Sequence, residues 1–328
     1  MSGAIVMDGD TATLLPDIAA IREAHARIAP HVHRTPVLTC SALDEETGAH
    51  LFFKCENFQK VGAFKARGAT NAVLSLTEDA ARHGVVTHSS GNHGAALAFA
   101  AARRGIPAYV VMPENSAQVK LANVRRYGAT VRICKPTLAA RETACAEVMA
   151  STGATLVHPF DDANVIAGQG TAALELLAQV PELDAVVAPV GGGGLMSGTA
   201  IAVKTVRPGI AVYGAEPANA DDAARSLASG HVEPASQAVT IGDGLRTTLA
   251  PRTLAALRTH VAAIGLATED GIVRAMRMTW ERMKVLIEPS SAVPLACLLE
   301  GTLDLRGRRV GIIVSGGNVD LDHLPWQP

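Results

Sequence analysis

One stretch of the sequence, residues 184–206, restricts the possible folds more than any other. Residues 184–190, Asp-Ala-Val-Val-Ala-Pro-Val, consist mostly of valine and alanine with no polar alternation, which is typical of a strand buried on both faces of a sheet. Four glycines follow, Gly191, Gly192, Gly193 and Gly194, and a helix is expected over 194–206. A buried strand that turns directly into a helix is typical of parallel sheets with crossover helices.

The same alternation continues along the rest of the chain and predicts an α/β fold. We expect strands over 51–55, 84–88, 108–112, 130–134, 155–158, 184–190, 211–215 and 309–314. We expect helices over 17–28, 92–104, 118–127, 138–151, 170–177, 194–206 and 268–284, and a further helix that begins near residue 65. In such sheets ligands bind at the carboxyl ends of strands. Three polar or glycine-rich turns fall there, at 89–94, 191–194 and 315–318.

Composition excludes several classes of partner. Hydrophobic residues make up 48% of the 328 residues, and the net charge is −2, so neither a nucleic-acid surface nor a membrane surface is indicated. No apolar run has the length of a membrane span, and the N-terminal stretch lacks the pattern of a secretory signal. Five scattered cysteines without a CxxC pair favour a reducing, cytoplasmic location.

The four glycines predict an anion site. Successive glycines let backbone N–H groups turn toward one point, and the start of the following helix adds partial positive charge. A phosphate is the expected ligand, and a flexible loop without a ligand is the alternative. A dinucleotide is disfavoured although Glu216 has the spacing of a ribose-binding acid, because Met196 or Ser197 occupies the third glycine position. A P-loop is excluded, since no Gly-Lys-Ser/Thr follows.

A lysine in the first turn of a predicted helix is a candidate nucleophile. Lys65 lies in the motif Gly-Ala-Phe-Lys-Ala-Arg-Gly, with no acidic neighbour. Partial desolvation there would lower its pKa and free the amine. The alternative is a surface lysine whose amine reaches water.

A reactive lysine, a phosphate cradle and polar turns together suggest pyridoxal 5'-phosphate (PLP). The sequence resembles the fold-type II PLP enzymes, which are similar to the tryptophan synthase β subunit. Within them it resembles the serine racemase and serine/threonine dehydratase family, which includes threo-3-hydroxyaspartate dehydratase. The resemblance covers nearly the whole chain, from Arg34-Thr-Pro36 to Asn318-Val-Asp320. It implies a large PLP-binding domain (1–79 and 161–328), a small inserted domain (80–160), an active site between two parallel-sheet domains, and a homodimer.

The resemblance also implies how the chain holds the cofactor. Lys65 would be the Schiff-base lysine, with Phe64 packed near the cofactor, and Asn92 would pair with the 3-hydroxyl oxygen of the ring. Gly191, Gly192, Gly193 and Gly194 would form the phosphate loop. Ser315 would pair with the ring nitrogen. A neutral hydroxyl there does not force that nitrogen to be protonated, which favours expulsion of a β-hydroxyl.

Further residues are implied to act on the substrate. Ser89, Asn92 and His93 would hold its carboxylate, and Arg141 matches a substrate-side arginine of serine racemase. Ser90 would be a second proton donor on the ring face opposite Lys65, because racemisation requires groups on both faces. Alternatively, Ser90 only binds the carboxylate or shapes the turn.

A divalent cation is also implied. Glu216, the Ala220 carbonyl and Asp222 follow a predicted strand and suit Mg²⁺ or Ca²⁺, which prefer oxygen ligands. The alternative is a solvated acidic turn. Ala95 replaces a glutamine of the nucleotide site in mammalian serine racemase, which argues against activation by ATP.

We therefore expect a PLP-dependent ammonia-lyase that dehydrates a β-hydroxy amino acid to a 2-oxo acid and ammonia. Serine, threonine and threo-3-hydroxyaspartate are the candidate substrates, and racemase activity is a possible addition. A primary serine racemase is the alternative within the family. Outside it, a nicotinamide-dependent oxidoreductase or a non-catalytic small-molecule-binding module would be the alternatives.

Overall fold

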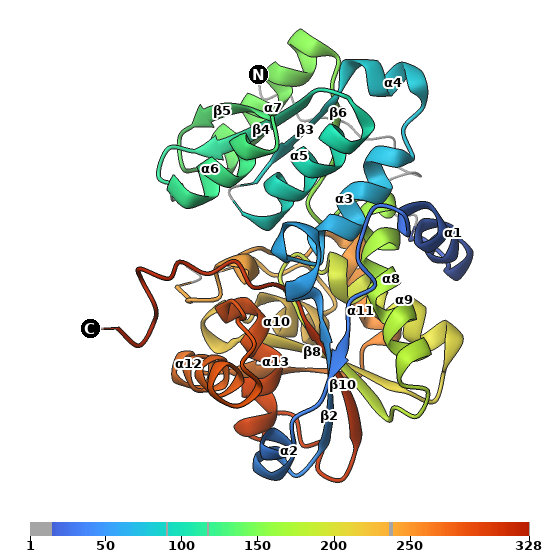
Figure 1. Ribbon diagram of the computed structural model, residues 1–328, viewed down its shortest axis with the longest axis vertical. Coiled ribbons are helices and arrows are strands. Elements are labelled where there is room, and N and C mark those ends of the chain that lie inside the picture. Colours follow the sequence, from blue (N-terminus) through green and yellow to red (C-terminus); the bar gives the residue numbers. More distant parts are fainter. Residues whose placement is uncertain (1–14, 90, 117, 236–238, 328) are drawn as a thin grey trace.

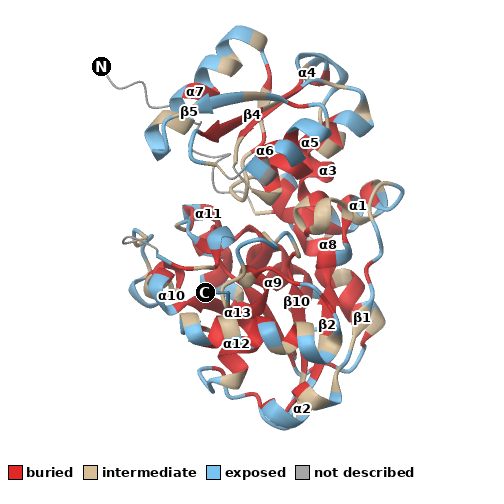
Figure 2. Ribbon diagram, turned by 60° about the vertical axis from the view of Figure 1, so that its left-hand side comes forward, coloured by how far each residue is buried: buried red, intermediate tan, exposed pale blue. Residues whose placement is uncertain are grey.

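The computed structural model describes residues 15–89, 91–116, 118–235 and 239–327. Two separate sheets, one above the other in Figure 1, form the centre of the molecule. In Figure 2 the inner strands of both sheets, and helices α8 and α9, are mostly buried, whereas the edge strand β5 is largely exposed.

The larger sheet has six strands and is parallel except at one edge. Their order is β1 (Val37–Leu38), β2 (His50–Cys55), β10 (Arg309–Val314), β7 (Ala185–Pro189), β8 (Ala211–Pro217) and β9 (Ala263–Ala267). The last of these strands in the sequence, β10, lies between β2 and β7, with Ile312 paired to Phe53 on one side and to Val187 on the other. The carboxyl ends of β10 and β7 therefore lie side by side.

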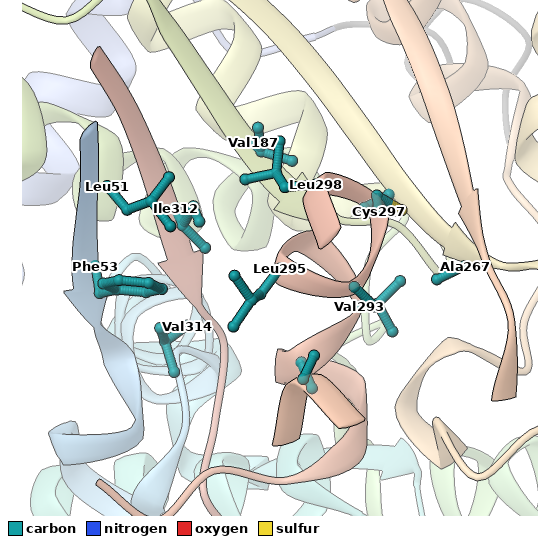
Figure 3. Packing of buried hydrophobic residues seen from close by; sticks show 14 of the residues in the cluster. Leu51, Phe53, Val187, Ala267, Val293, Leu295, Cys297, Leu298, Ile312 and Val314 are labelled. Atoms are coloured by element: carbon teal, nitrogen blue, oxygen red, sulfur yellow. The ribbon is translucent and has the colours of Figure 1, made fainter. Parts of the chain in front are cut away.

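Helices cover both faces of this sheet. The first face packs against α2 (Ser41–Thr47), α12 (Glu269–Met278) and α13 (Pro289–Leu299). Figure 3 shows Leu295 of α13 pointing toward Ile312 and Val314 of β10. The second face packs against α1 (Ile18–Ile28), α8 (Ala163–Gln179), α9 (Gly194–Val206) and α11 (Pro251–His260), and α10 (Asp222–Ser229) lies beside α11. Each fully buried Leu or Ile contributes about 1.5–3 kcal/mol through the hydrophobic effect.

The smaller sheet is fully parallel and uses one continuous part of the chain. Its order is β5 (Thr130–Cys134), β4 (Ala108–Pro113), β3 (Val85–His88) and β6 (Thr155–Leu156), and α4 (Glu78–His83) precedes it. Helices α5 (Asn92–Arg104) and α6 (Gln118–Arg126) cover one face, and α7 (Leu138–Thr152) covers the other. The division at residues 80 and 160 into two domains remains a prediction.

Helix α3 (Lys65–Leu74) connects the two halves, since it packs against α5 above and α8 below. A buried ion network fixes it. The Arg67 guanidinium donates to Glu56 Oε2 at 2.7 Å and to Glu175 Oε1 at 2.8 Å, and Lys54 Nζ donates to Glu175 Oε2 at 2.6 Å. Two cations thus balance two carboxylates where β2, α3 and α8 meet.

Several predicted elements need correction. The helix expected over 268–284 ends at Met278, and a π-helical turn, Thr279–Met283, follows it. The helix expected over 170–177 is longer and is α8. The sequence patterns did not indicate α2, α4, α10, α11, α13 or β9. Helix α13 contains Pro294 in its interior, a residue that normally argues against a helix. No helix in the described part of the chain is long and apolar enough to cross a membrane.

Candidate active site

Lys65 is the first residue of α3, as the sequence predicts, and its amine lies in a partly buried position. Its Nζ donates a hydrogen bond to the Pro159 carbonyl at 2.7 Å and lies 5.2 Å from the centre of the Phe64 ring. Burial lowers the pKa of Lys65 to about 8. Near neutral pH, the Lys65 amine is therefore uncharged in a larger fraction of molecules than the amine of an exposed lysine.

The imidazoles beside Lys65 are neutral. Burial lowers the pKa of His158 to about 3, with smaller contributions from His88 and the Lys65 amine, and burial also places the pKa of His93 well below its usual range. His158 Nδ1 accepts the Asp161 N–H at 2.9 Å, so the ring proton of the neutral form is on Nε2. Sequence reasoning gave no site role to residues 158–161, which begin with the last residue of a predicted strand.

The glycine turn fits an anion such as the phosphate of PLP. All four glycines are buried, and the N–H groups of Gly191, Gly192 and Gly193 have no hydrogen-bond acceptor among the described residues. Buried donors of this kind require a partner. Side chains are excluded here: a Cβ on Gly192 would lie 2.2 Å from the Phe160 ring, and Gly193 has a φ of +85°. The turn leads directly into α9, whose N-terminus favours negative charge.

Ser315 lies at the carboxyl end of β10, next to the glycine turn in the sheet, and is buried. Its carbonyl accepts the Phe64 N–H at 2.9 Å, and Ala63 forms a β-bridge with Gly316. These backbone contacts tie the start of α3 to the end of β10. Lys65 and Ser315, far apart in the sequence, are therefore held near each other.

Asn92 begins α5, and its side chain contacts residues from the part of the chain that forms the larger sheet. Its Nδ2 donates to Glu288 Oε1 at 2.9 Å, and its Oδ1 accepts from Asn318 Nδ2 at 2.9 Å. The same Nδ2 also lies 3.2 Å from Glu288 Oε2, so the Asn92 amide nitrogen donates toward both oxygens of that carboxylate. Sequence reasoning missed Glu288, because no local pattern marks a partner 196 residues away.

The residues expected at the substrate are only partly described. His93 is buried, with its Nε2 3.1 Å from the Val157 carbonyl, so it is not a surface residue. Arg141 lies in the first turn of α7, and its Nε is buried without a hydrogen-bond partner in the described part of the chain. Its charge is close enough to His88, at the end of β3, to add to the lowering of that pKa by burial. Ser89, which directly follows β3, is half-buried. Ser90 lies outside the described residues.

The carboxylates expected to bind a cation are buried, so the solvated acidic turn is excluded. Glu216 ends β8 and accepts the N–H groups of Ala223 at 3.1 Å and Ala224 at 2.8 Å, and both Asp222 oxygens lack a hydrogen-bond partner among the described residues. Burial raises the pKa of Glu216 to about 8 and that of Asp222 to about 6. Two buried carboxylates, one of them unpaired, fit a divalent cation; Ala220 lies between them in the sequence.

Comparison with known proteins agrees with this geometry. The family model described as "pyridoxal-phosphate dependent enzyme" matches residues 28–316. The chain is 51% identical to β-hydroxyaspartate dehydratase of Paracoccus denitrificans over 95% of this chain and 99% of the relative. It is also similar to the crystal structures of serine racemase from Dictyostelium discoideum (TM-score 0.89, 51% identity, 93% of this chain and 99% of that chain) and of threonine deaminase from T.th. (TM-score 0.89, 44% identity, 93% and 99%).

The chain therefore belongs to the pyridoxal-phosphate-dependent enzyme family, with the fold of the serine racemases and threonine deaminases.

Proposed function

We propose that this protein is a PLP-dependent ammonia-lyase that converts a β-hydroxy amino acid to a 2-oxo acid and ammonia, and that 3-hydroxyaspartate is its preferred substrate. The buried, unpartnered Nε of Arg141 beside the carboxyl end of β3 carries the choice of substrate. A second carboxylate would supply the missing acceptor for that guanidinium. Serine and threonine offer no such group.

Different residues of the chain have different roles at the site. The N–H groups of the glycine turn hold the phosphate, Asn92 and Ser315 fix the ring, and Lys65 provides both the covalent attachment and a base at Nζ. Bound PLP would supply an electron sink for the α-carbon. Lys65 suits the role of base because its amine is uncharged in a larger fraction of molecules near neutral pH. The neutral His93 and His158 add no charge that competes for the substrate carboxylates.

We further propose that Glu216, the Ala220 carbonyl and Asp222 hold Mg²⁺ or Ca²⁺, because Asp222 is buried without a hydrogen-bond partner among the described residues. A cytoplasmic location is supported by Cys40, Cys55, Cys134, Cys145 and Cys297, which are all free thiols.

A homodimer is supported by the exposed apolar side chains of Phe58 and Leu286, on neighbouring segments joined by the Asn57–Leu286 hydrogen bond. Sedimentation of the purified holoenzyme tests this last point.

The substrate assignment is tested by steady-state kinetics on 3-hydroxyaspartate, serine and threonine. Arg141→Met should lower kcat/KM for 3-hydroxyaspartate roughly ten- to hundredfold, as expected for one charge-assisted hydrogen bond, and should affect serine much less. The matched control is Arg132→Met, since Arg132 lies on β5 of the sheet that α7 covers but is exposed and pairs with the exposed Glu147. Equal losses on all three substrates would refute the role of Arg141. Absence of oxo-acid formation from any of them would refute the proposed function.

A further inference from the structure

The 158–162 turn, which leads from β6 to α8, contacts the Lys65 amine through its backbone. It begins at His158 and ends at Asp162, whose side chain caps α8. The Pro159 carbonyl accepts a hydrogen bond from Lys65 Nζ at 2.7 Å, and it is the only acceptor that the described residues offer to that amine. The direction of this carbonyl therefore influences which way the amine points.

The side chain of His158 holds the peptide group that carries this carbonyl. Its Nδ1 accepts the Asp161 N–H at 2.9 Å and the Phe160 N–H at 3.4 Å. Both donors are backbone N–H groups, so the ring nitrogen can only be the acceptor. The Phe160 N–H and the Pro159 carbonyl belong to one trans peptide group, in which N–H and C=O point in opposite directions. An N–H directed at His158 therefore directs the carbonyl away from His158, to the side where Lys65 lies.

Contacts on the outer side of the turn fix its place at the site. The Phe160 ring lies against Gly192, and it is edge-on to the His158 ring with 4.6 Å between the ring centres. Asp161 Oδ1 is 3.4 Å from Nε of the buried Arg252, on α11. The turn is thus held against the glycine turn and α11, while the bonds to Nδ1 orient its peptide groups.

We propose that His158 is a positioning residue, which holds the Pro159 carbonyl against the Lys65 amine and thereby orients the base. This inference rests on the proposed function, in which Lys65 removes a proton from the substrate. When the amine is free, the carbonyl binds one of its N–H groups and keeps the lone pair turned away from the turn. A carboxylate at position 158 would also accept the two backbone N–H groups, but its charge would stabilise the ammonium form of Lys65. The imidazole accepts them without charge.

Two variants of the holoenzyme separate the acceptor from the ring. His158→Phe keeps an aromatic ring beside Phe160 but removes the acceptor, whereas His158→Asn removes the ring but keeps an acceptor of the kind found in Asx turns. His158→Phe should lower kcat for oxo-acid formation about ten- to hundredfold, the effect of misplacing a reacting group by about 1 Å. KM should change much less, because the turn positions the base rather than the substrate. His158→Asn should keep most of the wild-type kcat.

Trace acetylation of the full-length apoprotein with peptide mapping gives a second measurement, without the cofactor. Labelling of Lys65 relative to the exposed Lys135 follows the uncharged fraction of the amine. Loss of the carbonyl acceptor destabilises the ammonium form, so the midpoint of the pH profile of His158→Phe should move to lower pH by about one unit, the value of one hydrogen bond to a charged group. Water that enters a loosened site would move it to higher pH. The titratable groups facing Lys65, His93 on α5 and His158, are neutral.

The outcomes separate this inference from the proposed function. An active wild type together with a His158→Phe variant that keeps the wild-type kcat or midpoint would overturn the inference alone, and so would a midpoint at higher pH. A His158→Asn variant as slow as His158→Phe would overturn it as well, because the ring would then be the important part. If His158→Phe does not fold, His158→Asn decides, since the inference requires it to keep the wild-type midpoint. A wild type that forms no oxo acid from any candidate substrate would overturn the proposed function instead.

Discussion

The chemistry of this protein depends on the surroundings of single side chains more than on their identity. Lys65 is an ordinary lysine in the sequence, but burial among neutral imidazole neighbours lowers its pKa to about 8. Arg141 and Asp222 each have polar atoms that are buried without a partner among the described residues. Such groups indicate where a ligand belongs, because an unpaired buried polar group is costly.

The pKa of Lys65 predicts how the apoenzyme binds PLP. Only the uncharged amine attacks an aldehyde, and the uncharged form predominates above the pKa. The rate of covalent binding should therefore rise about tenfold between pH 7 and pH 9 and then level off, whereas an unperturbed lysine would continue to gain up to about pH 10. Stopped-flow absorbance of the bound cofactor measures this rate, and borohydride reduction with peptide mapping identifies the lysine. Labelling of another lysine, or a rate that still rises steeply above pH 9, would contradict the assignment.

The second prediction concerns Ser90, whose position in the 89–94 turn is known from the sequence only. If Ser90 donates a proton from the face opposite Lys65, Ser90→Ala should reduce racemisation of serine by about 10²- to 10⁴-fold, the usual worth of one acid–base group. Dehydration of the L-substrate should fall much less. Both rates are measured on both enantiomers, and Ser89→Ala, at a residue expected to hold the carboxylate, serves as the comparison for a role in binding alone. Equal losses in dehydration and racemisation would show that Ser90 only binds substrate or shapes the turn.

Helices and strands position these side chains through contacts between residues that are far apart in the sequence. Helix α3 brings Lys65 to the site, and the network of Arg67, Glu56, Glu175 and Lys54 fixes α3 to β2 and α8. All four side chains are buried. Removal of one partner from such a network leaves an uncompensated charge in a region that excludes water.

Arg67→Met should therefore destabilise the protein by about 3–5 kcal/mol, because Glu56 and Glu175 would then share only the charge of Lys54. Urea unfolding measures the free energy of unfolding. The matched control is Arg306→Met, which removes the exposed pair with Asp304 and should cost less than about 1 kcal/mol. A loss at Arg67 no larger than that of the control would mean that the network does not hold α3 in place.

The elements that were predicted well and those that were missed differ in a physical way. Helix α5 has an apolar face and ends at Gly105 with a φ of +73°, so its limits are encoded locally, and α9 likewise begins at the expected glycine. Helix α13 instead tolerates Pro294 because its apolar surroundings stabilise it, and no local pattern shows that. Glu288 and Phe160 were missed at the site for the same reason. Each acts through a contact with a residue distant in the sequence.

The molecule as a whole combines one fully parallel sheet and one that is parallel except at its β1 edge, and the candidate site uses the carboxyl ends of strands from both. Turns after β3 belong to the smaller sheet, and turns after β7 and β10 to the larger. The hydrogen bonds of Asn92 with Glu288 and Asn318, and the packing of α3, join the two parts near the site. Stability of the larger sheet therefore supports the site as well as the fold. The proposed cation lies at the carboxyl end of that sheet, where β8 leads into α10.

Removal of the cation should destabilise the whole protein. Without it, Glu216 and Asp222 are two carboxylates in a buried position, and their repulsion and desolvation oppose folding. A chelator should lower Tm, and Mg²⁺ or Ca²⁺ should restore it; a cation at about 100 times its dissociation constant stabilises the folded state by about 2.7 kcal/mol. Asp222→Asn should make Tm insensitive to the chelator. Asp221→Asn is the matched control, because Asp221 is half-exposed and pairs with Arg225 at 2.8 Å, and it should keep the wild-type response. Unchanged Tm and activity after chelation of the wild type would mean that the two carboxylates share a proton rather than a metal.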